Sequence, residues 1–202
     1  MAVCGNPAFK IILCGDYGVG KSSLFRRFTS NTFIEGSVRE SALGLDHYAQ
    51  TFSVTSKDDF KVQLWDTGGM ERVATVTSSY YKFSDAAILT YSAEDLESFN
   101  NLSQHILEIV SYAENAKIFL CGNKADLHEY VTDSQINEFK EQCQDLIVKS
   151  YKVSCKSGVR VHEMFQDVAE TLSRENRQRI DPDAFKVAPP VEPKSKCGCG
   201  TG

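Results

Sequence analysis

Residues 15–22, Gly-Asp-Tyr-Gly-Val-Gly-Lys-Ser, have the composition and spacing of a phosphate-binding loop between a strand and a helix. The glycines allow backbone N–H groups to approach phosphate oxygens closely, and the N-terminus of the following helix adds a favourable dipole. Lys21 is suited to contact the β- and γ-phosphates, and the Ser22 hydroxyl is suited to bind Mg²⁺. An accidental glycine-rich turn is the alternative, with a chance of about one in a hundred in a chain of this length. The predicted phosphate-binding residues are Gly15, Asp16, Tyr17, Gly18, Val19, Gly20, Lys21, Ser22 and Ser23.

Two later polar motifs indicate which base the nucleotide carries. They are residues 123–126, Asn-Lys-Ala-Asp, and residues 154–156, Ser-Cys-Lys, and each follows an apolar segment. The Asp126 carboxylate can accept two hydrogen bonds from guanine, whereas adenine would leave that carboxylate unsatisfied. Asn123 can address the other edge of the base, the Lys124 stem can cover its ring face, and a backbone N–H of the second motif suits guanine O6. The predicted guanine-binding residues are Asn123, Lys124, Asp126, Ser154, Cys155 and Lys156.

Residues 66–69, Asp-Thr-Gly-Gly, end another strand-like segment and add a candidate metal ligand. Asp66 can hold Mg²⁺ through a water molecule. The Gly69 backbone N–H can bond the γ-phosphate and thereby report its presence. A simple tight turn is the alternative for this segment alone, and it is disfavoured beside the other motifs.

The elements that must position these motifs alternate between strands and helices. Apolar runs predict strands at 9–14, 48–55, 60–65, 86–91, 117–121 and 146–153, with a hairpin at 56–59. Helical periodicity predicts helices at 21–28, 99–113 and 161–172, and the capping box of Thr132 and Gln135 predicts one more. This order predicts an α/β fold with a mostly parallel six-stranded sheet, one antiparallel edge strand and helices on both faces. Ligands of such sheets bind at the carboxyl ends of the strands, which the motifs follow.

The composition is that of an ordinary soluble globular domain with a tail. The chain has 202 residues, of which 42% are hydrophobic and 24% charged. Its net charge of -5 is not typical of a nucleic-acid-binding protein, so we expect no nucleic-acid partner. Residues 1–9 do not resemble a signal peptide, and we expect the protein to meet the reducing cytosol. Cys4, Cys14, Cys121, Cys143 and Cys155 are scattered without metal-like spacing, and we expect Cys14, Cys121 and Cys155, which lie in or beside apolar runs, to be small buried residues with free thiols.

With these motifs, residues 9–175 resemble the small GTPases of the Ras superfamily. Four features favour the Rab branch, namely residues 43–46 (Leu-Gly-Leu-Asp), 61–65 (Lys-Val-Gln-Leu-Trp), 80–82 (Tyr-Tyr-Lys) and a two-cysteine tail. The resemblance implies a P-loop GTPase domain at 9–178 between an N-terminal extension, 1–8, and a hypervariable tail, 179–202.

The resemblance also implies a membrane-trafficking switch that alternates between GTP and GDP forms and uses Mg²⁺. Its partners would be effectors, an exchange factor, a GTPase-activating protein, a prenylation escort and a chaperone of the GDP-dissociation-inhibitor type. Trp65, Tyr80 and Tyr81 would lie near the effector-facing surface, with packing of Trp65 and one tyrosine in the core as the alternative. Phe33 would lie against the guanine edge, with simple packing as its alternative.

Three departures from the family pattern concern hydrolysis and γ-phosphate sensing. Ala42 stands where the family has a Thr that ligates Mg²⁺, and the neighbouring Ser41 is the candidate replacement ligand. Met70 stands where the family has the Gln that orients the attacking water, and a thioether cannot donate a hydrogen bond. Tyr17 replaces a small residue and would crowd the γ-phosphate side. The predicted catalytic positions are Lys21, Gly69 and Met70, and we expect slow GTP hydrolysis, with a GTP-holding scaffold that recruits effectors without turnover as the alternative.

The C-terminal segment carries two cysteines, Cys197 and Cys199, close to the end of the chain. Residues 181–196 contain four prolines and predict a flexible tail. Paired cysteines of this kind resemble the doubly prenylated ends of Rab proteins, and two lipids anchor a protein stably. We therefore expect the protein on the cytoplasmic side of an endomembrane compartment, with a cytosolic pool. Free thiols or a Cys-x-Cys metal site are the alternatives.

Overall fold

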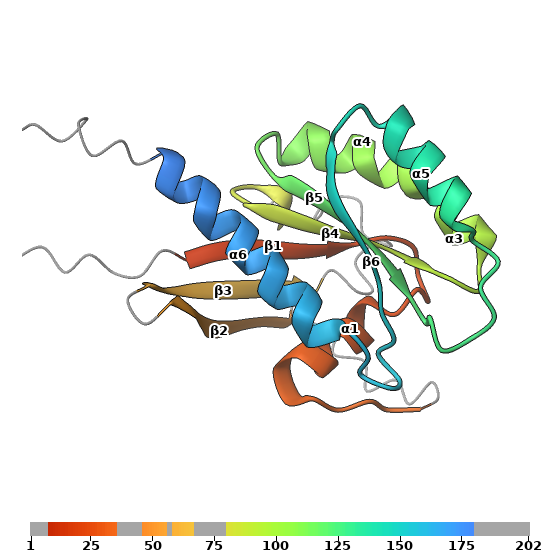
Figure 1. Ribbon diagram of the computed structural model, residues 1–202, viewed down its shortest axis with the longest axis horizontal. Coiled ribbons are helices and arrows are strands. Elements are labelled where there is room, and N and C mark those ends of the chain that lie inside the picture. Colours follow the sequence, from red (N-terminus) through yellow and green to blue (C-terminus); the bar gives the residue numbers. More distant parts are fainter. Residues whose placement is uncertain (1–7, 36–45, 56–57, 67–79, 180–202) are drawn as a thin grey trace, which may run out of the picture.

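The computed structural model describes residues 8–35, 46–55, 58–66 and 80–179 (Figure 1). Within these residues, the strands form one six-stranded sheet in the order β2-β3-β1-β4-β5-β6. Strand β2 pairs antiparallel with β3, and every other described pair is parallel. The strands are β1 (Ala8–Cys14), β2 (Asp46–Thr55), β3 (Asp58–Asp66), β4 (Ala86–Ser92), β5 (Lys117–Asn123) and β6 (Ile147–Lys152).

Helices cover both faces of this sheet (Figure 1). They are α1 (Lys21–Ser30), α3 (Leu96–Asn100), α4 (Leu102–Tyr112), α5 (Asp133–Gln142) and α6 (Val161–Arg179). Helices α1 and α6 lie on one face, and α3, α4 and α5 lie on the other. Successive side chains of β1 point to opposite faces of the sheet. Ile11 and Leu13 belong to the apolar cluster under α1 and α6. Ile12 and Cys14 belong to the apolar cluster under α3, α4 and α5. The central strand is therefore buried on both sides, as a parallel sheet requires.

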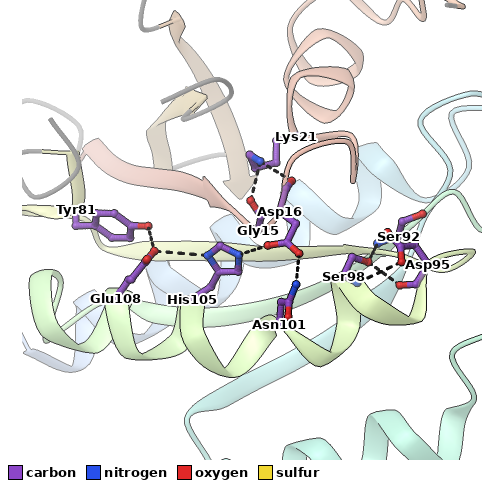
Figure 2. Close-up of polar contacts among 10 residues, drawn as sticks. All are labelled: Gly15, Asp16, Lys21, Tyr81, Ser92, Asp95, Ser98, Asn101, His105 and Glu108. Atoms are coloured by element: carbon purple, nitrogen blue, oxygen red, sulfur yellow. Dashed lines mark hydrogen bonds and ion pairs between the residues drawn. The ribbon is translucent and has the colours of Figure 1, made fainter. Parts of the chain in front are cut away.

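One predicted helix is two helices in the structure. The apolar periodicity predicted a single helix over 99–113, but α3 ends at Asn100 and α4 begins at Leu102. Helix α3 also begins before the predicted start, because the Asp95 side chain accepts hydrogen bonds from the backbone N–H groups of Glu97 and Ser98. Figure 2 shows Asp95 beside Ser98. The capping box of Thr132 and Gln135 is present at the start of α5, as predicted. The predicted hairpin turn falls partly on residues 56–57, which lie outside the described residues.

The aromatic side chains at the end of β3 and before β4 pack inward. Tyr80 and Tyr81 are buried, with 5% and 4% of their surface exposed, and Trp65 is half-buried with its ring 6.4 Å from that of Tyr80. The described surroundings of both tyrosines are thus those of core residues, one tyrosine more than the packing alternative assigned to the core.

Cys14, Cys121 and Cys155 are buried and their thiols are free, as predicted. Cys143 is half-buried and also forms no disulfide. Burial raises the pKa of the Cys14 and Cys155 thiols to about 12, so both remain protonated at neutral pH. Cys4 lies outside the described residues. None of the helices in the described part of the chain is long and apolar enough to cross a membrane.

Candidate nucleotide site

The loop between β1 and α1 is shaped by two glycines that no other residue could replace without distortion. Gly15 has φ 129° and Gly20 has φ 102°, both in the left-handed region that favours glycine. A Cβ atom on Gly15 would lie 2.0 Å from the Thr90 carbonyl oxygen, and a Cβ atom on Gly20 would lie 2.2 Å from Asn123 Nδ2. The loop backbone therefore lies directly against the ends of β4 and β5.

Lys21 occupies the position expected of a phosphate-binding lysine. Only 5% of the residue is exposed, and its Nζ donates to the backbone carbonyls of Gly15 and Asp16 at 2.7 Å each. Among the described residues, no carboxylate forms an ion pair with this ammonium group. A buried positive charge held only by neutral carbonyls is stabilised by an anion, so the loop fits a nucleotide phosphate. Tyr17, in contrast, is 59% exposed on the same loop.

Asn123 joins the phosphate loop to the second guanine motif. Its Nδ2 donates to the Val19 carbonyl oxygen at 2.9 Å, and its Oδ1 accepts the Cys155 backbone N–H at 3.2 Å. Only 1% of Asn123 is exposed. In the described part of the chain, Asn123 therefore joins two loops. The motif alone does not predict this structural role.

The Asp126 carboxylate is oriented by the neighbouring motif. Ser154 Oγ donates to Asp126 Oδ1 at 2.5 Å, and the Ser157 backbone N–H donates to Ser154 Oγ at 3.1 Å. Lys124 adopts φ 64°, which is uncommon for a residue other than glycine, and its Nζ forms an ion pair with Glu94 at 2.7 Å. The two guanine motifs thus lie side by side at the ends of β5 and β6, as the sequence predicted for the carboxyl edge of the sheet.

Arg27, in α1, is a functional candidate that the motifs missed. Its Nε and Nη2 donate to the Cys155 carbonyl oxygen at 2.9 and 2.7 Å, and Nη2 also donates to the Lys156 carbonyl oxygen at 3.0 Å. The Lys156 side chain itself forms an exposed ion pair with Glu35 at 2.8 Å. Phe33 is partly buried against the cluster under α1 and α6. The helix that follows the phosphate loop therefore also supports the predicted base-binding loop.

The candidate Mg²⁺ ligands lie at the same edge of the sheet. Ser22 and Ser23 are half-buried in the first turn of α1, and Asp66 is 7% exposed at the end of β3. Asp66 pairs in register with Leu13, one residue before β1 ends at the phosphate loop. A hydroxyl and a carboxylate are the oxygen ligands that Mg²⁺ prefers, so Ser22 and Asp66 fit the ion.

Several predicted residues cannot be located because they lie outside the described residues. These are Ser41, Ala42, Gly69, Met70, Cys197 and Cys199.

A phosphate loop, two guanine motifs and a carboxylate at the ends of parallel strands define the class of P-loop GTPases. The model of the Ras family matches residues 10–174. The "GTP-binding protein ypt1" of Schizosaccharomyces pombe is 36% identical over 197 residues, which cover 96% of this chain and 91% of that protein. The "Ras-related protein RABD2c" of Arabidopsis thaliana is 37% identical over 187 residues, which cover 91% of this chain and 89% of that protein.

The chain therefore belongs to the Ras family, and within it this protein is a Rab-like small GTPase of membrane trafficking. The predicted α/β GTPase fold and the Rab resemblance are confirmed.

Proposed function

We propose that this protein binds GDP and GTP, with Mg²⁺, at the carboxyl edge of its sheet and hydrolyses GTP slowly. The observation that supports this most is the Asn123 bridge, which holds the phosphate loop and the base motifs together through Val19 and Cys155. Three loops that each follow a different strand are thereby joined to one another. Such preorganisation lowers the entropy cost of binding a nucleotide.

Each group in this site has a separate part in binding. Asp126, with one oxygen already held by Ser154, accepts from the guanine edge, and Lys21 contacts the β- and γ-phosphates. Ser22 and Asp66 would hold Mg²⁺, and the bound ion would supply positive charge to the phosphates. The Lys124 stem covers the base, and Phe33 lies near its edge.

We propose that GTP hydrolysis is slow because of three residues. Met70 cannot orient a water molecule as Gln does, and Ala42 lacks a metal-binding hydroxyl unless Ser41 replaces it. Tyr17 presents a large exposed ring on the phosphate loop, where an inserted arginine from a partner would need space. This exposed ring also favours the second candidate function, a GTP-bound scaffold that recruits effectors without turnover.

The Asp126→Asn variant is expected to bind guanine nucleotides about 10- to 100-fold more weakly, because an amide replaces a charged acceptor of two hydrogen bonds. Fluorescence titration with labelled GDP, competed by unlabelled GTP and ATP, measures the effect.

Asp145→Asn is the matched control, since Asp145 is exposed between α5 and β6 and its φ of 65° is one that asparagine tolerates. Equal affinity of the wild-type protein for ATP and GTP would contradict the guanine assignment.

Localisation is proposed to depend on the tail. We expect prenylation of Cys197, Cys199 or both to hold the protein on the cytoplasmic side of an endomembrane, with a cytosolic pool bound to a chaperone of the GDP-dissociation-inhibitor type. Effectors, an exchange factor, a GTPase-activating protein and a prenylation escort complete the proposed set of partners.

Replacing both Cys197 and Cys199 by Ser is expected to move the protein from the membrane fraction to the soluble fraction, because both lipid anchors are lost. Intact-mass analysis of protein from cells should detect the isoprenoid additions that the double variant lacks. Cys143→Ser is the control and should leave the distribution unchanged. Unaltered membrane association of the double variant would reject prenylation as the anchor.

A further inference from the structure

A polar network connects the phosphate loop to helix α4 (Figure 2). Asn101 Nδ2 donates to Asp16 Oδ2 at 2.8 Å, and His105 Nε2 lies 2.7 Å from Asp16 Oδ1. On the other side of the ring, His105 Nδ1 lies 3.5 Å from Glu108 Oε2. Tyr81 donates its hydroxyl to the same Glu108 oxygen at 3.2 Å. The imidazole therefore lies between two carboxylates, and only 15% of its side chain is exposed.

The two contacts of the His105 ring differ in length. The Nε2 contact with Asp16 is a short hydrogen bond at 2.7 Å, whereas the Nδ1 contact with Glu108 is a longer ion-pair contact at 3.5 Å. These are the acidic groups that face the ring from the phosphate loop and from α4. The other titratable groups of the network are Tyr81, Cys14, which hydrogen bonds to Tyr81, and Lys21, whose charge acts on Asp16.

Asp16 itself does not titrate near neutral pH. Burial opposes its charge, but hydrogen bonds from Asn101 and His105 and the charges of His105 and Lys21 together hold the pKa of Asp16 below its ordinary value. The carboxylate therefore stays charged at neutral pH, where it can accept the hydrogen bonds from Asn101 and His105, and it is protonated only as the pH falls through the lowered pKa.

Asp16 also connects the network to Lys21. Its side chain contacts His105, and its backbone carbonyl accepts a hydrogen bond from Lys21 Nζ at 2.7 Å. The network is not a metal centre, because no group of three or more His, Cys, Asp or Glu in the described part of the chain is arranged to bind an ion.

We propose that His105 is a positioning residue for the phosphate loop, and that its hydrogen bond to Asp16 slows nucleotide release. The inference rests on the proposed nucleotide site. The His105 ring fixes the Asp16 side chain, and through the Asp16 backbone carbonyl it fixes Lys21 against the phosphates. Without the hydrogen bond from the ring, the loop opens more easily.

The test compares wild-type protein with His105→Gln and His105→Phe by displacing fluorescent GDP with excess GDP. Glutamine can still donate a hydrogen bond to Asp16, whereas phenylalanine keeps a ring but cannot donate. The release rate of His105→Phe should therefore exceed that of the wild type about five-fold, and the release rate of the conservative variant His105→Gln should stay close to that of the wild type.

Two further variants separate this role from general destabilisation. His162→Phe, at an exposed position at the start of α6, should follow the wild-type rate. In an Asp16→Asn background, His105→Phe should add little further acceleration, since the charged acceptor of the hydrogen bond is gone. A wild-type release rate in His105→Phe, or release from His105→Gln as fast as from His105→Phe, would overturn the proposal. Failure of wild-type protein to bind GDP would overturn the proposed nucleotide site instead.

Discussion

The Lys21→Ala variant is expected to bind GDP and GTP at least about 100-fold more weakly than wild-type protein, because charge-assisted contacts to two phosphate groups are lost together. In the described residues the Lys21 ammonium is buried, and its hydrogen bonds go to the carbonyls of Gly15 and Asp16. No carboxylate in the described part of the chain forms an ion pair with Lys21, so its positive charge is available to the nucleotide. Equilibrium titration with fluorescent GDP measures the loss, and the nucleotide content of the purified protein provides an independent check.

Lys140→Ala in the last turn of α5 is the matched control and should bind as wild type does. Thermal unfolding with excess nucleotide separates weak binding from misfolding, since a folded variant that cannot bind is not stabilised by ligand. Wild-type affinity of a folded Lys21→Ala variant would mean that the glycine-rich loop is not the phosphate site.

The sequence predicts the parts of the site that are contiguous and misses the contacts that join them. The residues that supply the phosphate loop stand next to one another between a strand and a helix, so their spacing alone predicts their chemistry. The contact of Asn123 with Val19 joins residues 104 positions apart, and that of Arg27 with Cys155 joins residues 128 positions apart. No local pattern encodes such pairs, because strand order in the sheet decides which loops become neighbours.

Local patterns also fail to predict the break between α3 and α4, where the sequence predicted one continuous helix. Apolar residues on both sides of Asn101 continue one helical periodicity, since Phe99 and Leu102 both face the cluster under α3, α4 and α5. Periodicity reports which face is buried and carries no information about a backbone break of one residue. Asn101 itself is used at this break, where its side chain donates to Asp16. The sequence contains both residues, but only the fold brings them together.

The Met70→Gln variant is expected to hydrolyse GTP about ten-fold faster than wild-type protein in a single turnover, which corresponds to a modest reduction of the barrier. Catalysis by this class consists mostly of positioning and electrostatic stabilisation, so a group that orients the attacking water has a large effect. A glutamine side chain both donates and accepts hydrogen bonds, whereas the thioether of methionine is only a weak acceptor. Met70→Leu is the matched control, because it keeps an apolar side chain of similar volume and should leave the rate unchanged.

Two double variants separate the effects of Met70, Ala42 and Tyr17 on the rate of GTP hydrolysis. If Met70→Gln alone has no effect but Met70→Gln with Ala42→Thr is faster, then the missing hydroxyl at position 42 limits the reaction. If Met70→Gln with Tyr17→Gly responds to an added arginine-supplying activating protein and Met70→Gln alone does not, then the exposed ring of Tyr17 blocks that arginine. A wild-type rate already equal to that of Gln-bearing relatives would show that another group positions the water, and the role assigned to Met70 would be wrong. A slow wild-type rate that rises with Met70→Gln would instead mean that the protein spends longer in its GTP form, since the length of that state is set by hydrolysis when exchange is unchanged.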